Sequence, residues 1–149
     1  MKGFLLDSNV LSVRRKGPRS NPHVSAWFDS VADDELFLSV LVVGEIRKGV
    51  ELARPNDPVK ARALETWLAG LKQVYGDHLL PITPTVADQW GRLAALRPLA
   101  TTDGLLAATA LVHNLTFVTR NVADVAHTGV TLLNPFIPLD DAAQPERII

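Results

Sequence analysis

The chain has 149 residues, 47% hydrophobic and 21% charged, which is the composition of an ordinary globular protein long enough to build one core. It contains no cysteine, which excludes disulfides and thiolate metal sites and is typical of a reducing compartment. Fifteen basic and 16 acidic residues give a net charge of -1. That balance disfavours nucleic-acid binding through overall charge but allows a local basic patch.

Breaker residues and the spacing of apolar residues divide the chain into alternating strands and helices. In chain order, the predicted elements are a strand at 3–7, helices at 9–16 and 23–31, a strand at 35–39, helices at 41–53 and 59–75, a short strand at 79–82, a helix at 84–96, a helix that starts at 101–103, and strands at 115–119 and 131–133. Pro81 favours an edge position for the third strand. The alternation predicts an α/β fold with a parallel sheet that is covered on both faces.

Domain boundaries and location follow from the same scan. We expect a single domain over residues 1–138 and a loose C-terminal tail at residues 139–149. No apolar run approaches the roughly 18 residues that a membrane span needs. The N-terminal segment has the pattern of a strand rather than the apolar core of a signal peptide. We therefore expect a cytoplasmic protein with no membrane contact.

Four acidic residues fall near the carboxyl ends of predicted strands. Asp7 ends the first strand, and Glu45 lies about one turn into the helix that follows the second strand. Asp103 opens the helix before the fourth strand, and Asp124 follows that strand. Ligands of open α/β sheets bind beyond the carboxyl ends of the strands. We therefore expect the four carboxylates to lie at one edge of the sheet.

Each acid taken alone also has an ordinary structural interpretation. Asp7 and Asp103 could cap helices, Asp124 could be a turn residue, and Glu45 could be a solvated helix residue. Four acids at one edge favour a site instead. In particular, we expect Asp7 to serve an ion rather than the helix backbone.

Electrostatics indicates what such a site would bind. Two carboxylates about 4 Å apart repel by about 4 kcal/mol at an effective dielectric constant of 20. Several in one pocket must therefore either take up protons or bind a cation. Oxygen ligands without His or Cys suit Mg²⁺ or Mn²⁺ rather than Zn²⁺. Such an ion works with phosphate substrates, where it activates water and offsets charge on a phosphodiester.

Four stretches of the sequence resemble the PIN-domain ribonucleases, and within them the VapC/FitB-like toxins of toxin–antitoxin pairs. They are LLDSNVLS at 5–12, LSVLVVGEIRKG at 38–49, TDGLLAATALVHNLTFVTRNVADV at 102–125 and GVTLLNPF at 129–136. Each motif alone is weak, but the ordered set is specific and runs nearly from end to end. Gly104 departs from the family pattern, because alanine or serine is more usual after the third acid.

The resemblance implies a fold, an activity and partners. It implies a three-layer α/β/α sandwich on a mostly parallel sheet and a Mg²⁺- or Mn²⁺-dependent endoribonuclease that cleaves RNA by metal-activated water. It implies that this nuclease is a toxin, that a cognate protein antitoxin blocks the acidic pocket, and that the toxin forms a homodimer. By position, the catalytic and metal-binding residues would be Asp7, Glu45, Asp103 and Asp124. The supporting polar residues would be Ser8, Asn9, Thr119 and Asn121.

Local cations are the candidates for contacts with RNA phosphates. Arg14, Arg15 and Arg120 lie near the expected mouth of the site, whereas Arg19 and Lys48 have the pattern of solvated surface residues. The alternative function is a catalytically weak PIN-like module that binds RNA or protein without cutting. A phosphatase with a nucleophilic aspartate is disfavoured because Asn9 stands where its second acid would be. A dinucleotide-binding enzyme is disfavoured because no glycine-rich turn follows the first strand.

Overall fold

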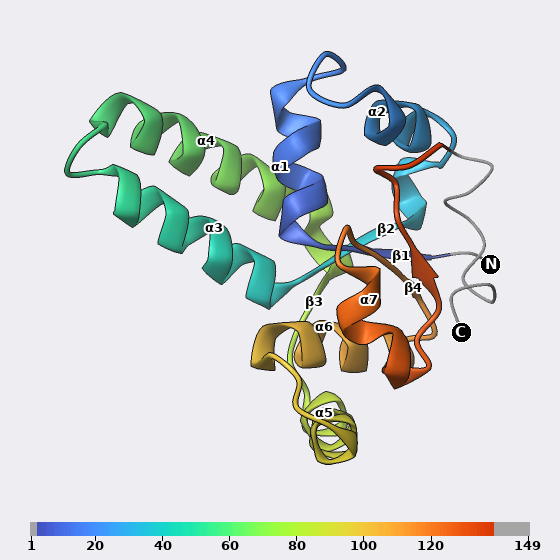
Figure 1. The fold of residues 1–149 in the computed structure, drawn as a ribbon. Coiled ribbons are helices and arrows are strands. Elements are labelled where there is room, and N and C mark those ends of the chain that lie inside the picture. The colour runs from blue at the N-terminus through green and yellow to red at the C-terminus, as the bar shows by residue number, and fades with distance from the viewer. Residues whose placement is uncertain (1–2, 139–149) are drawn as a thin grey trace.

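The computed structural model describes residues 3–138, and a five-stranded sheet lies at its centre (Figure 1). The strands are β1 (Phe4–Leu6), β2 (Leu36–Ser39), β3 (Leu79–Leu80), β4 (Thr116–Val118) and β5 (Leu132–Leu133). Every neighbouring pair is parallel, in the order β3-β2-β1-β4-β5. The predicted parallel sheet and the edge position of the third strand are therefore confirmed. The predicted tail at 139–149 lies outside the described residues.

Over residues 3–138, seven α-helices and three one-turn 3₁₀ helices surround the sheet. The α-helices are α1 (Ser8–Lys16), α2 (Pro22–Asp29), α3 (Val40–Ala53), α4 (Pro58–Tyr75), α5 (Pro84–Leu96), α6 (Thr101–Val112) and α7 (Val122–Val125). The 3₁₀ helices are η1 (Asp33–Glu35), η2 (Gly76–His78) and η3 (Ala126–Thr128). None of the helices within residues 3–138 is long and apolar enough to cross a bilayer.

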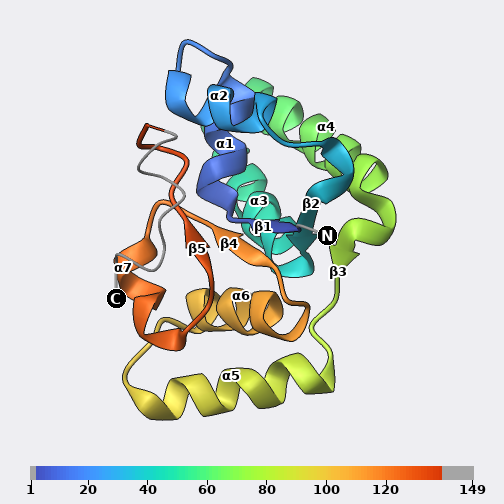
Figure 2. The same cartoon turned by 90° about the vertical axis from the view of Figure 1, so that its right-hand side faces the viewer.

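The helices form layers on the two faces of the sheet, which confirms the predicted α/β/α sandwich. Helices α1 to α4 lie on one side, and α6 lies on the other with α5 outside it (Figures 1 and 2). Helix α3 packs along α4, and α5 packs along α6. Helix α5 therefore forms the outer part of this layer, beyond α6.

The core explains why the strands are apolar on both faces. Phe4, Leu5 and Leu6 of β1 are all buried, as are Phe117 and Val118 of β4. A parallel strand covered on both sides has no solvent face, so its residues do not alternate between apolar and polar. Helix α6 is correspondingly rich in small buried residues, which let it approach the sheet closely: Gly104, Ala107, Ala108 and Ala110.

The topology singles out one place at the carboxyl edge of the sheet. From β1 the chain adds β2 and then β3 on one side, whereas β4 and β5 lie on the other. The order therefore reverses between the neighbouring strands β1 and β4. Open α/β sheets bind their ligands at such a reversal, beyond the carboxyl ends of the strands. Here Asp7 follows β1 and Thr119 follows β4.

Candidate functional site

Asp7 is held rigidly where β1 ends. It is only 5% exposed, and its backbone N–H donates to the carbonyl of Val118 at 3.0 Å. Its Oδ1 accepts a hydrogen bond from the Ser8 N–H at 2.7 Å. Its Oδ2 accepts from the Thr119 hydroxyl at 2.7 Å and from the Asn9 side-chain amide at 3.3 Å. The carboxylate is thus fixed by groups from both β1 and β4 sides of the sheet reversal.

One expectation about Asp7 was wrong. Asp7 is the N-cap residue of α1, with extended backbone and a side chain that accepts from the first N–H of the helix. The reason is local, because a helix that starts directly after β1 needs an acceptor for its free N–H groups. Asp7 therefore serves the backbone through Oδ1, while Oδ2 is oriented by Thr119 and Asn9.

Thr119 links Asp7 to the segment that carries Asp124. Its hydroxyl is buried, donates to Asp7 and accepts from the Asn121 N–H at 3.1 Å. The Asp124 N–H in turn donates to the Asn121 carbonyl at 3.2 Å. The Asn121 and Asp124 side chains are exposed. Sequence periodicity missed α7, the helix that carries Asp124, because a four-residue helix has no repeat to detect.

Glu45 stands on α3, whose start is fixed by the buried Ser39 hydroxyl accepting from the Leu41 N–H at 3.0 Å. Glu45 is exposed overall, yet loss of water around its carboxyl group and the nearby charge of Asp7 raise its pKa. Asp103 adds to this effect, whereas Ser8 and Lys48 oppose it. The negative charges of Asp7 and Asp103, at the same edge of the sheet, therefore disfavour the ionised form of Glu45.

Asp103 lies in the first turn of α6 and is partly buried. The N-cap position is Ala100, which gives no side-chain hydrogen bond, so Asp103 is not the cap of its own helix. Partial burial and then the charges of Asp7 and Asp124 raise its pKa. The positive end of α6 favours an ionised acid at this position.

The four predicted acids thus interact with one another at one edge of the sheet. Asp7 acts on Glu45 and Asp103, and Asp124 acts on Asp103. Within residues 3–138, however, no group of three or more His, Asp or Glu side chains is arranged so that it could hold a metal ion. The carboxylates are therefore close enough to affect one another's pKa values, but they are not close enough together to coordinate one metal ion.

A groove of about 620 Å³ opens beside Glu45. Its polar lining consists of Ser8, Ser12, Glu45, Lys48 and Thr102, and its apolar lining includes Leu41, Leu64 and Trp67. The sequence interpretation missed Ser12 and Thr102, and it expected Lys48 on the solvated surface, where Lys48 is exposed at the edge of this groove. Ser12 follows Ser8 by one helical turn and Thr102 precedes Asp103, so both spacings were available as signals.

The three arginines predicted to contact phosphates are all exposed, and each lies over an aromatic ring. Arg14 lies 4.1 Å from the centre of the Phe28 ring, Arg15 lies 5.5 Å from that of Trp67, and Arg120 lies 4.7 Å from that of Phe136. Such stacking holds a guanidinium in place without neutralising it. Arg14 and Arg15 line a second groove rather than the one beside Glu45.

Comparison with known proteins identifies the family. The PIN domain model matches residues 4–126. Toxin FitB of Neisseria gonorrhoeae is 31% identical over 138 residues, which cover 89% of this chain and 98% of that protein. VapC ribonuclease Y4jK of Sinorhizobium fredii is 27% identical over 91% of this chain and 99% of its own. A chain in the crystal structure of FitAcB from Neisseria gonorrhoeae superposes with a TM-score of 0.80 and 32% identity, over 89% of this chain and 97% of that one. The chain belongs to the PIN domain family.

Proposed function

We propose that the protein is a metal-dependent endoribonuclease that acts as the toxin of a toxin–antitoxin pair. The observation that carries the proposal is the group of four uncompensated carboxylates at the reversal of strand order, where Asp7 is buried and held by four hydrogen bonds. The names of the relatives, a toxin and a ribonuclease, support the same function.

The donor atoms of these residues suit Mg²⁺ or Mn²⁺, although among residues 3–138 the carboxylates would have to move closer together to hold the ion. The acid side chains offer only oxygen donors, and Glu45 and Asp103 both have raised pKa values because burial and neighbouring negative charge disfavour their ionised forms. The buried Oδ1 of Asn9, beside Asp7, has no hydrogen-bond partner in the part of the chain that the structure describes. Asp7, Glu45, Asp103 and Asp124 would hold the ion. When bound, it would supply a Lewis acid that activates water and offsets phosphate charge.

The chain's own residues orient the substrate and the acids. Thr119 and Ser8 fix the Asp7 carboxylate, so it does not have to reorganise during the reaction. Lys48 and the hydroxyls of Ser12 and Thr102 line the groove in which a phosphodiester would lie. Arg15 and Arg120, held over aromatic rings, would contact flanking phosphates.

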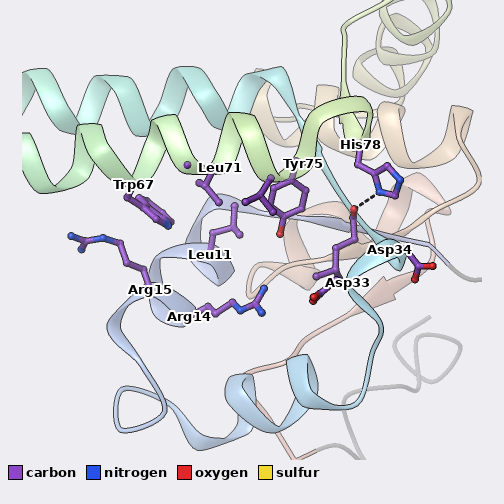
Figure 3. A pocket seen from close by; sticks show the side chains of 12 residues that line it. Leu11, Arg14, Arg15, Asp33, Asp34, Trp67, Leu71, Tyr75 and His78 are labelled. Carbon is purple, nitrogen blue, oxygen red and sulfur yellow. Dashed lines mark hydrogen bonds between the residues drawn. The ribbon is translucent and has the colours of Figure 1, made fainter.

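A second groove, of about 700 Å³, suits the antitoxin (Figure 3). Leu11, Arg14 and Arg15 from α1 face Trp67, Leu71 and Tyr75 from α4, and Asp33 and Asp34 lie at one end. An apolar floor between basic and acidic walls fits an amphipathic protein segment that carries both charges. Trp67 also lines the groove beside Glu45, so the two grooves meet there.

The antitoxin assignment has a direct test. Val74 lines the second groove and is 80% exposed, so Val74→Glu should leave folding and RNA cleavage unchanged while it weakens inhibition by the antitoxin about tenfold or more. Val59→Glu, also on α4 but outside the groove lining, is the matched control. Unchanged inhibition of the Val74 variant would place the antitoxin elsewhere. The homodimer and the cytoplasmic location stay predictions.

The activity itself is tested with purified protein and a mixture of cellular RNAs in Mg²⁺, in Mn²⁺ and in EDTA. We expect cleavage only with metal and a loss of about 100-fold or more in Asp103→Asn, because that change removes one charge from the acid group. Sequencing of the cut ends after brief expression, beside a Glu45→Gln control, then identifies the RNA. Cleavage by Asp103→Asn at the wild-type rate would refute the assignment of the site.

One observation favours a second candidate. No metal-holding group of three side chains exists among residues 3–138, which fits a PIN-like module that binds RNA or protein without cutting. The same assay separates the two. A binding module would retain RNA equally in Mg²⁺ and in EDTA and would produce no new ends.

A further inference from the structure

Gly104, directly after Asp103, leaves no room for a larger residue. A Cβ at this position would lie 2.8 Å from Cδ1 and 3.0 Å from Nε1 of Trp90, and 2.9 Å from Cδ2 of Leu99. Favourable contacts between carbon atoms need about 3.5–4.0 Å. The Trp90 ring therefore occupies the space that a side chain at position 104 would need.

Trp90 reaches this space from α5. It follows Val86 by four residues and precedes Leu93 by three, so all three lie on the face of α5 that packs toward the core. Its indole Nε1 is buried and has no hydrogen-bond partner within residues 3–138. Because no hydrogen bond fixes the ring, its position is set by shape, through the contact with Gly104 and Leu99.

The first turn of α6 depends on this contact. No side chain caps the helix, and its N-terminal end is held by a backbone bond from the Gly104 N–H to the Ala100 carbonyl at 2.9 Å. The buried residues that follow, such as Ala107 and Ala108, pack against the core. The Trp90 ring lies against the same turn from α5.

We propose that Trp90 is a positioning residue, which sets the distance of the first turn of α6 from the sheet through Gly104 and thereby places Asp103 relative to Asp7. The inference rests on the proposed nuclease function for its catalytic consequence. Its structural consequence, the placement of Asp103, does not depend on that function.

The test is the variant Gly104→Ala, with Gly91→Ala as its matched control. Both replace a helical glycine by alanine, but a Cβ at position 91 meets nothing within 4 Å. We expect Gly104→Ala to lower kcat by about 100-fold with little change in KM, because a displacement of about 1 Å at a reacting group has that effect. Gly91→Ala should retain wild-type kcat.

A size exchange distinguishes positioning from general destabilisation. In Gly104→Ala with Trp90→Leu, the smaller side chain vacates the space that the new methyl group needs, so kcat should recover at least tenfold over the single variant. Trp90→Leu alone should lower kcat, and Trp90→Phe should retain more activity than Trp90→Leu. These Trp90 variants test the proposal even if Gly104→Ala does not fold. Failure of the double variant to recover would overturn it.

Readouts without RNA separate this inference from the proposed function. In Gly104→Ala, the amide NMR signal of Asp7, which is remote in sequence from the substitution, should shift, and Mn²⁺ should bind about tenfold more weakly, with both effects absent in Gly91→Ala. If the wild-type protein cleaves no RNA but these effects appear, the nuclease proposal fails and the positioning role stands. If RNA is cleaved and neither the Asp7 signal nor the Mn²⁺ affinity changes, the positioning role fails.

Discussion

Helix α3 carries two clusters of charge that differ in their balance. In the first, Arg47 and Arg54 pair with Glu51 of the same helix and with Glu65 of α4, at 3.0 to 3.1 Å for three of the four contacts. The arginines lower the pKa of Glu51 to about 2. The second cluster begins two residues earlier on α3, at Glu45. Loss of water around its carboxyl group and the negative charges of Asp7 and Asp103 raise the pKa of Glu45.

The comparison distinguishes charges that pair with opposite charges in the folded protein from charges whose neighbours are mainly of the same sign. Each glutamate of the first cluster pairs with two arginines, so the charges of this cluster balance one another. In the second cluster, Lys48 is the one cation among residues 3–138 that affects the pKa of Glu45, against the two carboxylates of Asp7 and Asp103. Uncompensated negative charge is costly for a folded chain, and this cost is one reason for our proposal that a cation binds at the second cluster.

The largest expected effect distinguishes the two roles of Asp7. Asp7→Asn keeps an oxygen that can accept from the Ser8 N–H, so the cap of α1 survives, but the charge is lost. We expect cleavage to fall about 100-fold or more with little change in stability. Asp7→Ala should lose the same activity and also about 1 kcal/mol of unfolding free energy, since the cap is gone. Urea denaturation and cleavage assays on both variants measure this. Equal stability of the two would mean that the cap contributes nothing.

The second effect isolates the bond between the two sides of the sheet. Thr119→Val keeps the shape of the side chain but leaves the Asp7 Oδ2 without its closest donor and the Asn121 N–H without its acceptor. We expect a loss of about 10- to 100-fold in cleavage and about 1–3 kcal/mol in unfolding free energy. Thr116→Val, on β4, is the control and should change neither quantity as much.

The third effect concerns pH in the absence of metal. Because the folded-state pKa of Glu45 is raised above its ordinary value of 4.5, the folded state holds this proton more tightly than the unfolded state. Its contribution to stability therefore falls as pH rises above about 4.5 and through the raised pKa. In EDTA at neutral pH, Glu45→Gln should raise Tm by less than about 2–4 °C, because solvent screens the exposed Glu45 side chain. Added Mg²⁺ should raise the Tm of the wild-type protein more than that of the variant. A lower Tm of the variant in EDTA would contradict the electrostatic account.

The smallest effect belongs to the balanced cluster. Glu65→Gln removes one partner from both arginines, yet all of these groups are solvent-exposed to a similar degree, so Tm should fall by less than about 4 °C. The loss should shrink in 1 M salt and should leave cleavage unchanged. Asp88→Asn, which breaks the isolated pair with Arg92 on α5, gives the reference for a single surface pair.

The sequence predicted those features that depend on neighbouring residues. Helix α5 begins and ends where its pattern places it, because Pro84 suits the first turn and Thr83 caps it. Strand β3 is two residues shorter than expected, since Pro81 has no N–H to continue the ladder. The four acids could be assigned to one edge because strand ends in a parallel sheet meet there.

Features that depend on packing between elements could not be predicted. From the sequence, Gly104 is only a residue with low helix propensity, which costs about 1 kcal/mol of helix stability. In the structure, the Trp90 ring packs against the position where its side chain would be. The distances between carboxylates on four different elements are set by such contacts. The spacing of residues along the chain does not determine these distances. The sequence therefore predicted that the site would offer carboxylate oxygens, but it did not predict how they are arranged.

The hydrogen bond between Thr119 and Asp7 joins residues 112 positions apart. A chain still being synthesised has Asp7 outside the ribosome long before Thr119 has been added. Until β4 docks beside β1, the first aspartate lacks the Thr119 hydroxyl, and the third and fourth acids have no sheet edge on which to gather. The proposed site therefore cannot assemble before the chain has been synthesised past residue 124.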